Sequence, residues 1–494
     1  MHTTSAYPGG GGPGRTVGEL LDEAPTSRFH RRAALVSGVG FFTDAYDLFV
    51  ISTVAALVSE QWHLGTAETS WVAGSAILGA FIGAIGFGRL ADRVGRRPVY
   101  GVVAGLMIAG AVLSALAPSF AVLVAARLLL GLGIGGDYPV SAVLMSEYAN
   151  RANRGRLVGI VFSMQAVGLV VGPLIAIALL GSGIGADATW RILLGLGALP
   201  AAAVIWLRAR MPESPRFQAQ VRGDTQRATR DLAAFAGQAL HALPGQPAGP
   251  GEHTVAGRPA ASGSLRQGGI RRLLTDRRSL ALVVGTAGAW FLFDYAYYGN
   301  TLSLPAILAA VDPGATTIGK LALSLVMFIA FAVPGYLLAI WRMDRFGHRR
   351  LQAVGFGVMA ATFLALGAVG PLTHLVAPFV AIFGLSYFFT EFGPNTTTFV
   401  LPAEVFPTHS RTTGHGLAAG LGKLGAFIGV FLVPQLQAAV GLRGMLLVAT
   451  AASVAGLLCT RLLPEPGRRS LDDVAGSGAP TGEPGGEAPA ARSA

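Results

Sequence analysis

The chain has 494 residues, of which 52% are hydrophobic and 13% are charged, and its formal net charge at pH 7 is +11. Soluble globular chains carry about 25% charged residues, and many apolar runs here reach the ~20 residues that a membrane helix needs. An ordinary soluble enzyme, a disordered chain and a secreted disulfide scaffold are excluded, the last because Cys459 is the single cysteine. The basic residues lie between apolar spans, which indicates membrane topology and no nucleic-acid partner.

The first 30 residues are rich in Gly, Pro, Ser and Thr and predict a flexible cytoplasmic segment. Twelve long apolar runs follow, and each predicts one transmembrane helix. Their ranges are 33–58, 69–91, 98–117, 119–147, 156–181, 189–209, 280–310, 318–342, 350–370, 374–402, 411–438 and 440–462. The predicted fold class is an all-α membrane protein with twelve transmembrane helices.

The loops between these runs alternate between basic and nearly neutral. Because basic loops stay in the cytoplasm, we expect a multi-pass protein of the plasma membrane with both termini cytoplasmic. The first third of the central loop is expected to form one or two short helices, and the remainder a linker. The chain is therefore predicted to have five parts. They are a flexible N-terminal segment (1–30), a six-helix bundle (31–210), a cytoplasmic central loop (211–278), a second six-helix bundle (279–463) and a disordered cytoplasmic tail (464–494).

The two halves repeat one another at a nearly constant offset. Asp92 in GRLADRVGRRP matches Asp344 in WRMDRFGHRR, with 344 − 92 = 252. Asp44 and Asp294 match with 294 − 44 = 250, and Glu147 and Glu404 with 404 − 147 = 257. A parallel repeat of six plus six helices is typical of major facilitator transporters, which hold substrate near the midplane between pseudo-symmetric bundles.

Several ionisable side chains fall within the predicted spans, where each costs at least ~2.5–3.5 kcal/mol and therefore indicates function. They are Asp44, Asp47, Arg127, Asp137, Asp294, Glu391 and Lys423. Lys423 is one of only two lysines and needs a buried partner, for which Asp294 and Glu391 are the candidates. The alternative is an ion pair that locks helices together without touching a substrate.

Polar side chains gather in the same helices. Trp290, Asp294 and Tyr298 are spaced i, i+4 and i+8, which places them along one helical face. With Gln165 and Asn395 they offer donors that suit a small oxyanion. A protonated aspartic acid also donates to an anion, so proton and anion would bind cooperatively. The residues therefore predict proton-coupled anion uptake.

Four segments resemble the phosphate:proton symporter family: GFFTDAYDLF at 40–49, GGDYPVSAVLMSEYANRANRGR at 135–156, WFLFDYAYYG at 290–299 and FGPNTTTFVLPAEVFPT at 392–408. The resemblance implies that inorganic phosphate is bound by Tyr138, Gln165, Trp290, Asp294, Tyr298 and Asn395. It also implies that Asp44 and Asp137 handle the proton and that Lys423 helps to release Asp294. Family members often carry Asn at the position of Glu391, which here adds a carboxyl group, and fungal members tend to carry a glutamate near Val103.

Asp47 and Arg127 are also predicted to take part in proton coupling. Arg127 occupies the position of a superfamily motif linked to proton coupling, and anchoring of helix packing is the alternative. A second set of charges at the basic loops is expected to latch the outward-facing state. These gating residues are Asp92, Arg96, Glu147, Arg154, Asp344, Arg345, Glu404 and Arg411.

The sequence therefore predicts a proton-coupled phosphate importer that works by rocking of its two halves, with protons, phosphate and the lipid bilayer as partners and one chain sufficient for function. The alternatives are a proton symporter for an organic acid or sugar, and a phosphate-sensing membrane receptor. No HExxH, GxSxG or Walker pattern is present, so neither an enzyme nor a metal or other cofactor is predicted.

Overall fold

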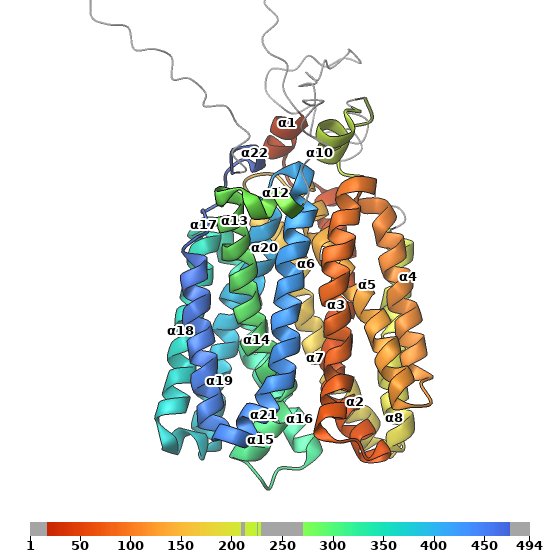
Figure 1. Cartoon of the computed structure of the whole chain (residues 1–494), viewed down its shortest axis with the longest axis vertical. Helices are drawn as coiled ribbons and strands as arrows, with labels where there is room; N and C mark the ends of the chain where they lie inside the picture. Colours follow the sequence, from red (N-terminus) through yellow and green to blue (C-terminus); the bar gives the residue numbers. More distant parts are fainter. Residues whose placement is uncertain (1–16, 209–212, 225, 229–269, 475–494) are drawn as a thin grey trace, which may run out of the picture.

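The computed structural model describes residues 17–208, 213–224, 226–228 and 270–474, and every regular element in these ranges is helical. The helices run nearly parallel to one another in a tall bundle (Figure 1). The short helices α1 (Val17–Glu23), α10 (Pro215–Phe217) and α22 (Leu471–Val474) lie together at one end. We call this the basic end, because it carries the Arg-rich loops around Asp92 and Asp344.

The first half contains six spans, as predicted. They are α2 (Arg28–Trp62), α3 (Thr66–Val94), α4 (Arg96–Ala115), α5 (Phe120–Tyr148), α6 (Arg154–Ser163) continued by α7 (Gln165–Gly181), and α8 (Ala186–Leu196) continued by α9 (Ala198–Arg208). Membrane helices tolerate Pro because neighbouring groups satisfy the freed carbonyl, and α5 and α7 contain Pro139 and Pro173.

The second half starts with α12 (Ile270–Thr275) and again contains six spans. They are α13 (Arg277–Val283) with η4 (Val284–Gly288), α14 (Ala289–Leu302) and α15 (Leu304–Val311); α16 (Thr317–Met327) with η5 (Phe328–Ala332) and α17 (Val333–Phe346); α18 (His348–Ala368); α19 (Val376–Thr390) with η7 (Glu391–Asn395) and α20 (Thr396–Val405); and the two parts of α21 (Arg411–Thr460). Gly441, with φ 70°, divides α21 into the eleventh and twelfth spans.

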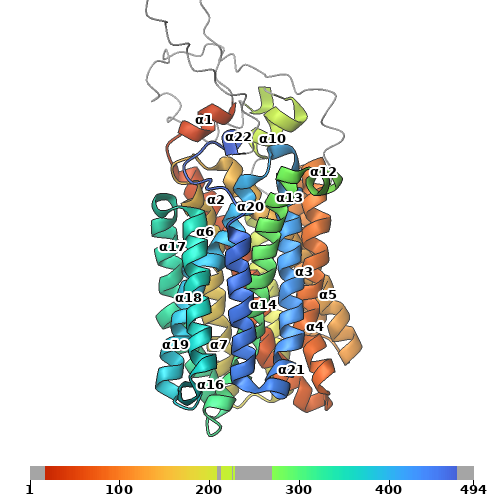
Figure 2. The same cartoon turned by 60° about the vertical axis from the view of Figure 1, so that its left-hand side comes forward.

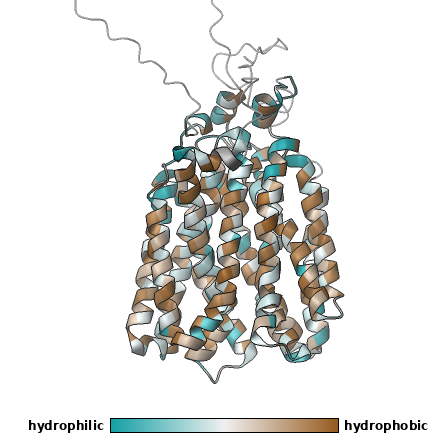
Figure 3. Cartoon of the chain, in the orientation of Figure 1, coloured by the Kyte–Doolittle hydropathy of each residue, from teal (hydrophilic) through white to brown (hydrophobic). Residues whose placement is uncertain are grey.

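Ten unbroken described helices are long and apolar enough to cross a membrane. Two further spans bring the number to twelve. One is formed by α8 and α9, which are each too short to be counted alone, and the other is the second span within α21. Apolar residues cover the outer helices along their length, and polar residues concentrate at the two ends (Figure 3). Leu337 and Trp341 are 62% and 58% exposed on this outer surface, as expected of side chains that face lipid.

The two halves meet along α3 and α21, and along α6 and α17; the view in Figure 2 shows α3 beside α21 from a second direction. Gly88 and Gly416 make the first contact close. A Cβ atom at Gly416 would lie 2.3 Å from the Ala84 carbonyl oxygen, so a larger residue would push the helices apart. Small residues allow this kind of backbone approach in membrane helices.

Helices extend into both predicted terminal segments. α1 lies in the predicted N-terminal segment, where its Asp22 accepts from Arg154, and α2 already begins at Arg28. α22 lies within the predicted tail and buries Leu471. Of the predicted central loop, α10 and the π turn η1 (Gln218–Arg222) form the expected short helical part. Residues 1–16, 229–269 and 475–494 lie outside the described residues.

Candidate functional site

A buried ion pair lies between α14 and α21. Lys423 Nζ donates to Asp294 Oδ2 over 2.9 Å and to the Tyr298 hydroxyl over 3.0 Å. All three side chains are at most 2% exposed. The predicted i, i+4 face of Trp290, Asp294 and Tyr298 therefore forms, and Asp294 rather than Glu391 is the partner of Lys423.

Aromatic rings close the space around this pair. The Lys423 ammonium lies 4.7 Å from the ring centroid of Tyr138 and 4.2 Å from that of Tyr298. The Tyr138 and Trp290 rings are 6.2 Å apart across the two halves, and the Tyr138 hydroxyl faces that of Tyr298. Tyr138 therefore brings a hydroxyl group of the first half to the ion pair of the second.

A second polar cluster crosses between the halves beside the first. Gln165 Oε1, on α7, accepts from the Tyr336 hydroxyl over 2.6 Å and from Asn395 Nδ2 over 3.1 Å. Asn395 Nδ2 also contacts the Tyr336 oxygen at 2.8 Å and donates to Glu391 Oε2. The sequence predicted Gln165 and Asn395 but missed Tyr336, which no polar neighbour in the chain singles out.

The other three acidic residues within the membrane spans each lie in different surroundings. Asp44 on α2 is buried near Tyr138, next to the ion pair. Asp137 accepts from Ser141 over 2.9 Å, inside the first bundle. Asp47 lies farther from the centre, where Arg127 Nη2 donates to its carbonyl oxygen over 3.1 Å and Nη1 lies 3.8 Å from its carboxylate. Asp47 and Arg127 thus join α2 to α5 within one bundle.

At the basic end, Asp92 at the end of α3 caps the start of α21 in the other half. Its carboxylate accepts from the backbone N–H of Thr412 and Thr413 and from the Thr413 hydroxyl, over 3.3, 2.6 and 2.7 Å. An anion at a helix N-terminus is stabilised by the free N–H groups and the helix dipole. Asp92 therefore ties the two halves together, as predicted of a gating residue.

Asp344 makes the same connection in the opposite direction. Its carboxylate accepts from the backbone N–H of Gly155 and Arg156 at the start of α6, over 3.0 and 2.9 Å. Each half thus caps a helix of the other with its repeated aspartate. The two aspartates that match in the sequence repeat therefore occupy equivalent positions in the structure.

Buried charges lie behind each cap. Arg96 pairs with Asp92 at 3.3 Å and with Glu147 at 3.0 Å, and Arg411 reaches Glu147 across the halves at 3.5 Å. In the second half the corresponding partner of Glu404 is His348, at 2.9 Å, which also lies 3.4 Å from Asp344. The contact of Arg411 with Glu147 thus joins the two halves once more at the basic end.

Two predicted gating residues are placed differently. Arg345 is exposed, and His348 rather than Arg345 joins the acids of the second half. Arg154 binds Asp22 of α1 at 2.7 Å and the Arg469 carbonyl at 3.0 Å, and it also lies close enough to Glu404 at the end of α20 for their charges to attract. The sequence analysis missed the contact of Arg154 with Asp22 because the two residues are 132 positions apart. Asp22 also binds Arg216 at 2.6 Å, and these two residues are 194 positions apart.

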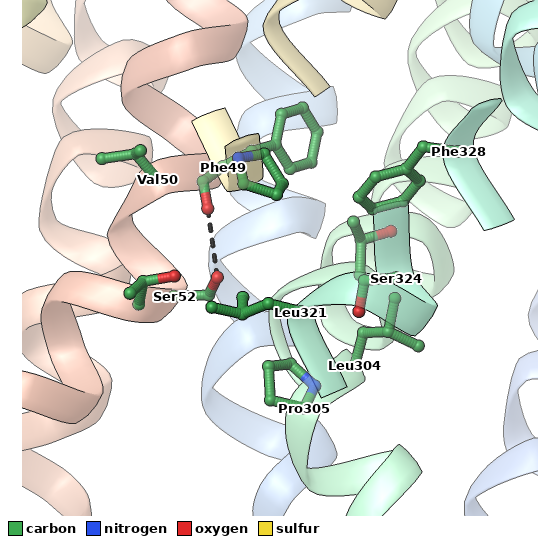
Figure 4. Close-up of a pocket in the computed structure, with 11 residues that line it drawn as sticks. Phe49, Val50, Ser52, Leu304, Pro305, Leu321, Ser324 and Phe328 are labelled. Atoms are coloured by element: carbon green, nitrogen blue, oxygen red, sulfur yellow. Dashed lines mark hydrogen bonds between the residues drawn. The ribbon is translucent and has the colours of Figure 1, made fainter. Parts of the chain in front are cut away.

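A small pocket of about 20 Å³, with room for about one water molecule, lies on the side of the ion pair away from the basic end. Figure 4 shows its lining from α2, α15, α16 and η5, with the Ser52 hydroxyl donating to the Phe49 carbonyl. Phe49 also stacks on Tyr298, with centroids 5.8 Å apart. The stacked rings of Phe49 and Tyr298 therefore lie between the pocket and Lys423.

The polar groups at the centre are hydroxyl, indole, amide and ammonium donors with a single ion-paired carboxylate among them. His415, two turns before Lys423 on α21, adds a ring 5.6 Å from Trp290 that sequence reasoning missed. Within the described ranges no group of three or more His, Cys, Asp or Glu is arranged to hold a metal ion. The arrangement suits an anion with several oxygen atoms.

Solved structures share this architecture. A proton:xylose symporter of the major facilitator superfamily, bound to 6-bromo-6-deoxy-D-glucose, has a TM-score of 0.75 at 20% identity, covering 91% of this chain and 99% of its own. An inward-open structure of the E. coli xylose transporter has a TM-score of 0.63 at 20% identity, covering 90% and 98%. The fold is that of major facilitator transporters.

Within that class, the chain belongs to the sugar (and other) transporter family, which residues 33–475 match. Inorganic phosphate transporter 1-6 of Oryza sativa subsp. japonica is 35% identical over 95% of this chain and 97% of its own length. The repressible high-affinity phosphate permease of Neurospora crassa is 32% identical over 94% and 89%.

Proposed function

We propose that this protein is a proton-coupled symporter that imports inorganic phosphate across the plasma membrane by alternating access. The observation that carries the proposal is the Lys423–Asp294 pair, enclosed by donors from both halves. The relatives named as phosphate transporters support the substrate. Nothing in this arrangement requires an enzyme's nucleophile or a resident cofactor.

The first half offers Tyr138 and Gln165, and the second offers Trp290, Tyr298 and Asn395. Phosphate needs donors on all sides because it has four oxygen atoms, and hydrogen bonds to a charged group are stronger than neutral ones. One chain supplies the whole set, so we propose that the monomer is the working unit. Contacts from both halves allow closure around the ligand to drive the rocking motion.

Proton coupling follows from the charge of Asp294. An ionised Asp294 holds Lys423 and repels an incoming anion, whereas a protonated Asp294 frees the ammonium and no longer repels. Anion and proton therefore favour each other's binding equally, by linkage. We assign the onward passage of the proton to Asp44, which is near Tyr138, and to Asp137, and the support of α2 to Asp47 with Arg127.

Direction follows from the two ends. The basic end faces the cytoplasm by the positive-inside rule, and its caps and ion pairs hold it closed while the pocket lies at the other end. Phosphate enters through that pocket, past Phe49 and Tyr298. Each net positive charge carried inward with it gains about 2.3 kcal/mol per 100 mV.

The substrate is tested by uptake of radiolabelled phosphate into proteoliposomes under an inward proton gradient. We expect uptake that unlabelled phosphate or arsenate inhibits and that xylose or succinate leaves unchanged. Uptake of a sugar or an organic acid that phosphate does not inhibit would assign a different substrate. Deleting residues 229–269 separates a sensor from a transporter, because uptake in a transporter should survive the loss of these residues.

A further inference from the structure

Glu391 is a second carboxyl group in the membrane interior, and its surroundings differ from those of Asp294. It begins η7 in the middle of the tenth span and is 0% exposed. Lys423 is bonded to Asp294 and Tyr298 instead, and among the described residues no cation pairs with Glu391. A buried charge without a cation is strongly unfavourable.

The groups that face Glu391 are neutral. They are Tyr297 from α14, Tyr336 from α17, Tyr387 from α19 and Asn395 from its own turn. From α18, Gly355 packs on Pro394, and from α20 the Thr396 hydroxyl donates to the Glu391 carbonyl. The hydroxyl groups of Tyr297 and Tyr336 both face the Glu391 carboxyl group.

Glu391 is joined to the anion site through one amide group. Asn395 Nδ2 donates to Glu391 Oε2 and also contacts Gln165 Oε1 at 3.1 Å and the Tyr336 oxygen at 2.8 Å. An amide nitrogen has two hydrogen atoms, so both are engaged within the protein. Asn395 can donate to phosphate only when one of these contacts is released.

We propose that Glu391 is a second proton-binding group of the transport cycle and that Asn395 couples its proton to phosphate. The inference rests on the proposed function. An ionised Glu391 holds the amide in a charge-assisted bond and repels the anion. A proton taken from the outer solution forms an O–H bond on the carboxyl group, weakens its hold on Asn395 and removes the repulsion.

The same O–H bond breaks after the basic end opens, and the proton leaves to the cytoplasm with phosphate. Together with Asp294, this gives two protons per phosphate. One monovalent phosphate with two protons carries one net positive charge inward, so uptake responds to the membrane potential as well as to pH.

The test measures the number of protons carried with each phosphate, from the reversal potential of uptake in proteoliposomes. Glu391→Gln keeps the shape and one acceptor but cannot take up a proton. We expect it to carry one proton fewer than the unchanged protein, with its uptake no longer driven by voltage. Glu391→Asp keeps a carboxyl group and should retain both protons.

Tyr336→Phe is the matched control, because it removes a hydroxyl from the same cluster and leaves the carboxyl group in place. It should weaken phosphate binding without changing the proton count. Glu391→Asn, with the residue that the resembled family often carries, serves if Glu391→Gln does not fold. An unchanged proton count in either neutral variant would overturn the role of Glu391, whereas an absence of phosphate uptake by the unchanged protein would overturn the proposed function.

Discussion

His348 takes in the second half the place that Arg96 takes in the first. Each follows the repeated aspartate by four residues, and 348 − 96 equals 344 − 92, or 252. Arg96 bonds Asp92 and Glu147, and His348 bonds Asp344 and Glu404. The two halves therefore close the basic end with one geometry and two different bases.

This relationship predicts a strong coupling between His348 and Glu404. We expect His348→Ala and Glu404→Gln each to lower the unfolding temperature of the purified protein. In the double variant, the loss of unfolding free energy should be smaller than the sum of the two single losses by about 0.5–3 kcal/mol, as for other contacting pairs. Strictly additive effects would show that the 2.9 Å contact contributes nothing.

Removing the charge of Asp92 should open the basic end. Asp92→Asn weakens three hydrogen bonds to the start of α21, each worth about 1.5–3 kcal/mol when the acceptor is charged. We expect a larger share of inward-facing molecules, seen as longer distances between spin labels at the exposed positions Arg93 and Arg345 in a Cys459→Ser background.

Asp187→Asn is the control for that experiment. Asp187 forms an exposed pair with Arg191 at the opposite end of the bundle, where its side chain is 53% exposed. Exposed pairs contribute about 0–1 kcal/mol, so this variant should keep the distance distribution of the unchanged protein. Equal distributions for the two variants would contradict a latch at Asp92.

Loss of an amide group from the central polar cluster should weaken the binding of phosphate. Gln165→Ala removes the acceptor shared by Tyr336 and Asn395, and we expect KM for phosphate to rise by roughly 5- to 150-fold, the equivalent of about 1–3 kcal/mol. The maximal rate should change less. Tyr138→Phe should act in the same direction.

Gln352→Ala provides the comparison. Gln352 is equally buried, but it bonds Thr460 and Thr397 within the second bundle. We expect lower thermal stability and an unchanged KM. If both glutamine variants raise KM equally, the effect of Gln165 is structural.

The Asp294–Lys423 pair should be needed for coupling rather than for folding. In Asp294→Asn the amide mimics a protonated acid, so phosphate binds but no longer depends on a proton at this position. We expect the accumulation ratio to fall by at least about tenfold, which corresponds to 1.4 kcal/mol, with the size-exclusion profile unchanged. Normal accumulation would remove Asp294 from the mechanism.

Lys423→Gln tests the other partner. It leaves Asp294 buried without a cation, and a neutral acid is then favoured throughout the cycle. Phosphate should bind and exchange across the membrane, while the proton carried by Asp294 is lost and the accumulation ratio falls. Wild-type net uptake in this variant would show that release of Asp294 does not need the ammonium.

The fold could be predicted from the sequence because membrane spans are encoded locally. Twelve apolar runs gave twelve spans, and the repeated aspartates identified equivalent positions that both cap helices of the opposite half. The spacing of Asp294 and Tyr298 likewise placed them on one face. These inferences need only helix periodicity and the cost of burying charge.

Other features depend on contacts between distant residues. Tyr336 bonds Gln165 and Asn395, which are 171 and 59 residues away. Asp22, in a segment that looked flexible, is ordered by Arg154 and Arg216. His348 could have been found, since the offset of 252 applied to Arg96 leads directly to it.

The most direct test of the account follows phosphate and protons together in proteoliposomes that contain the purified protein. With an inward proton gradient, phosphate should accumulate above its external concentration while the interior acidifies. A protonophore should abolish both, and Asp294→Asn should reduce both. Phosphate entry at the same rate with the gradient dissipated, and without concentration inside, would contradict proton coupling.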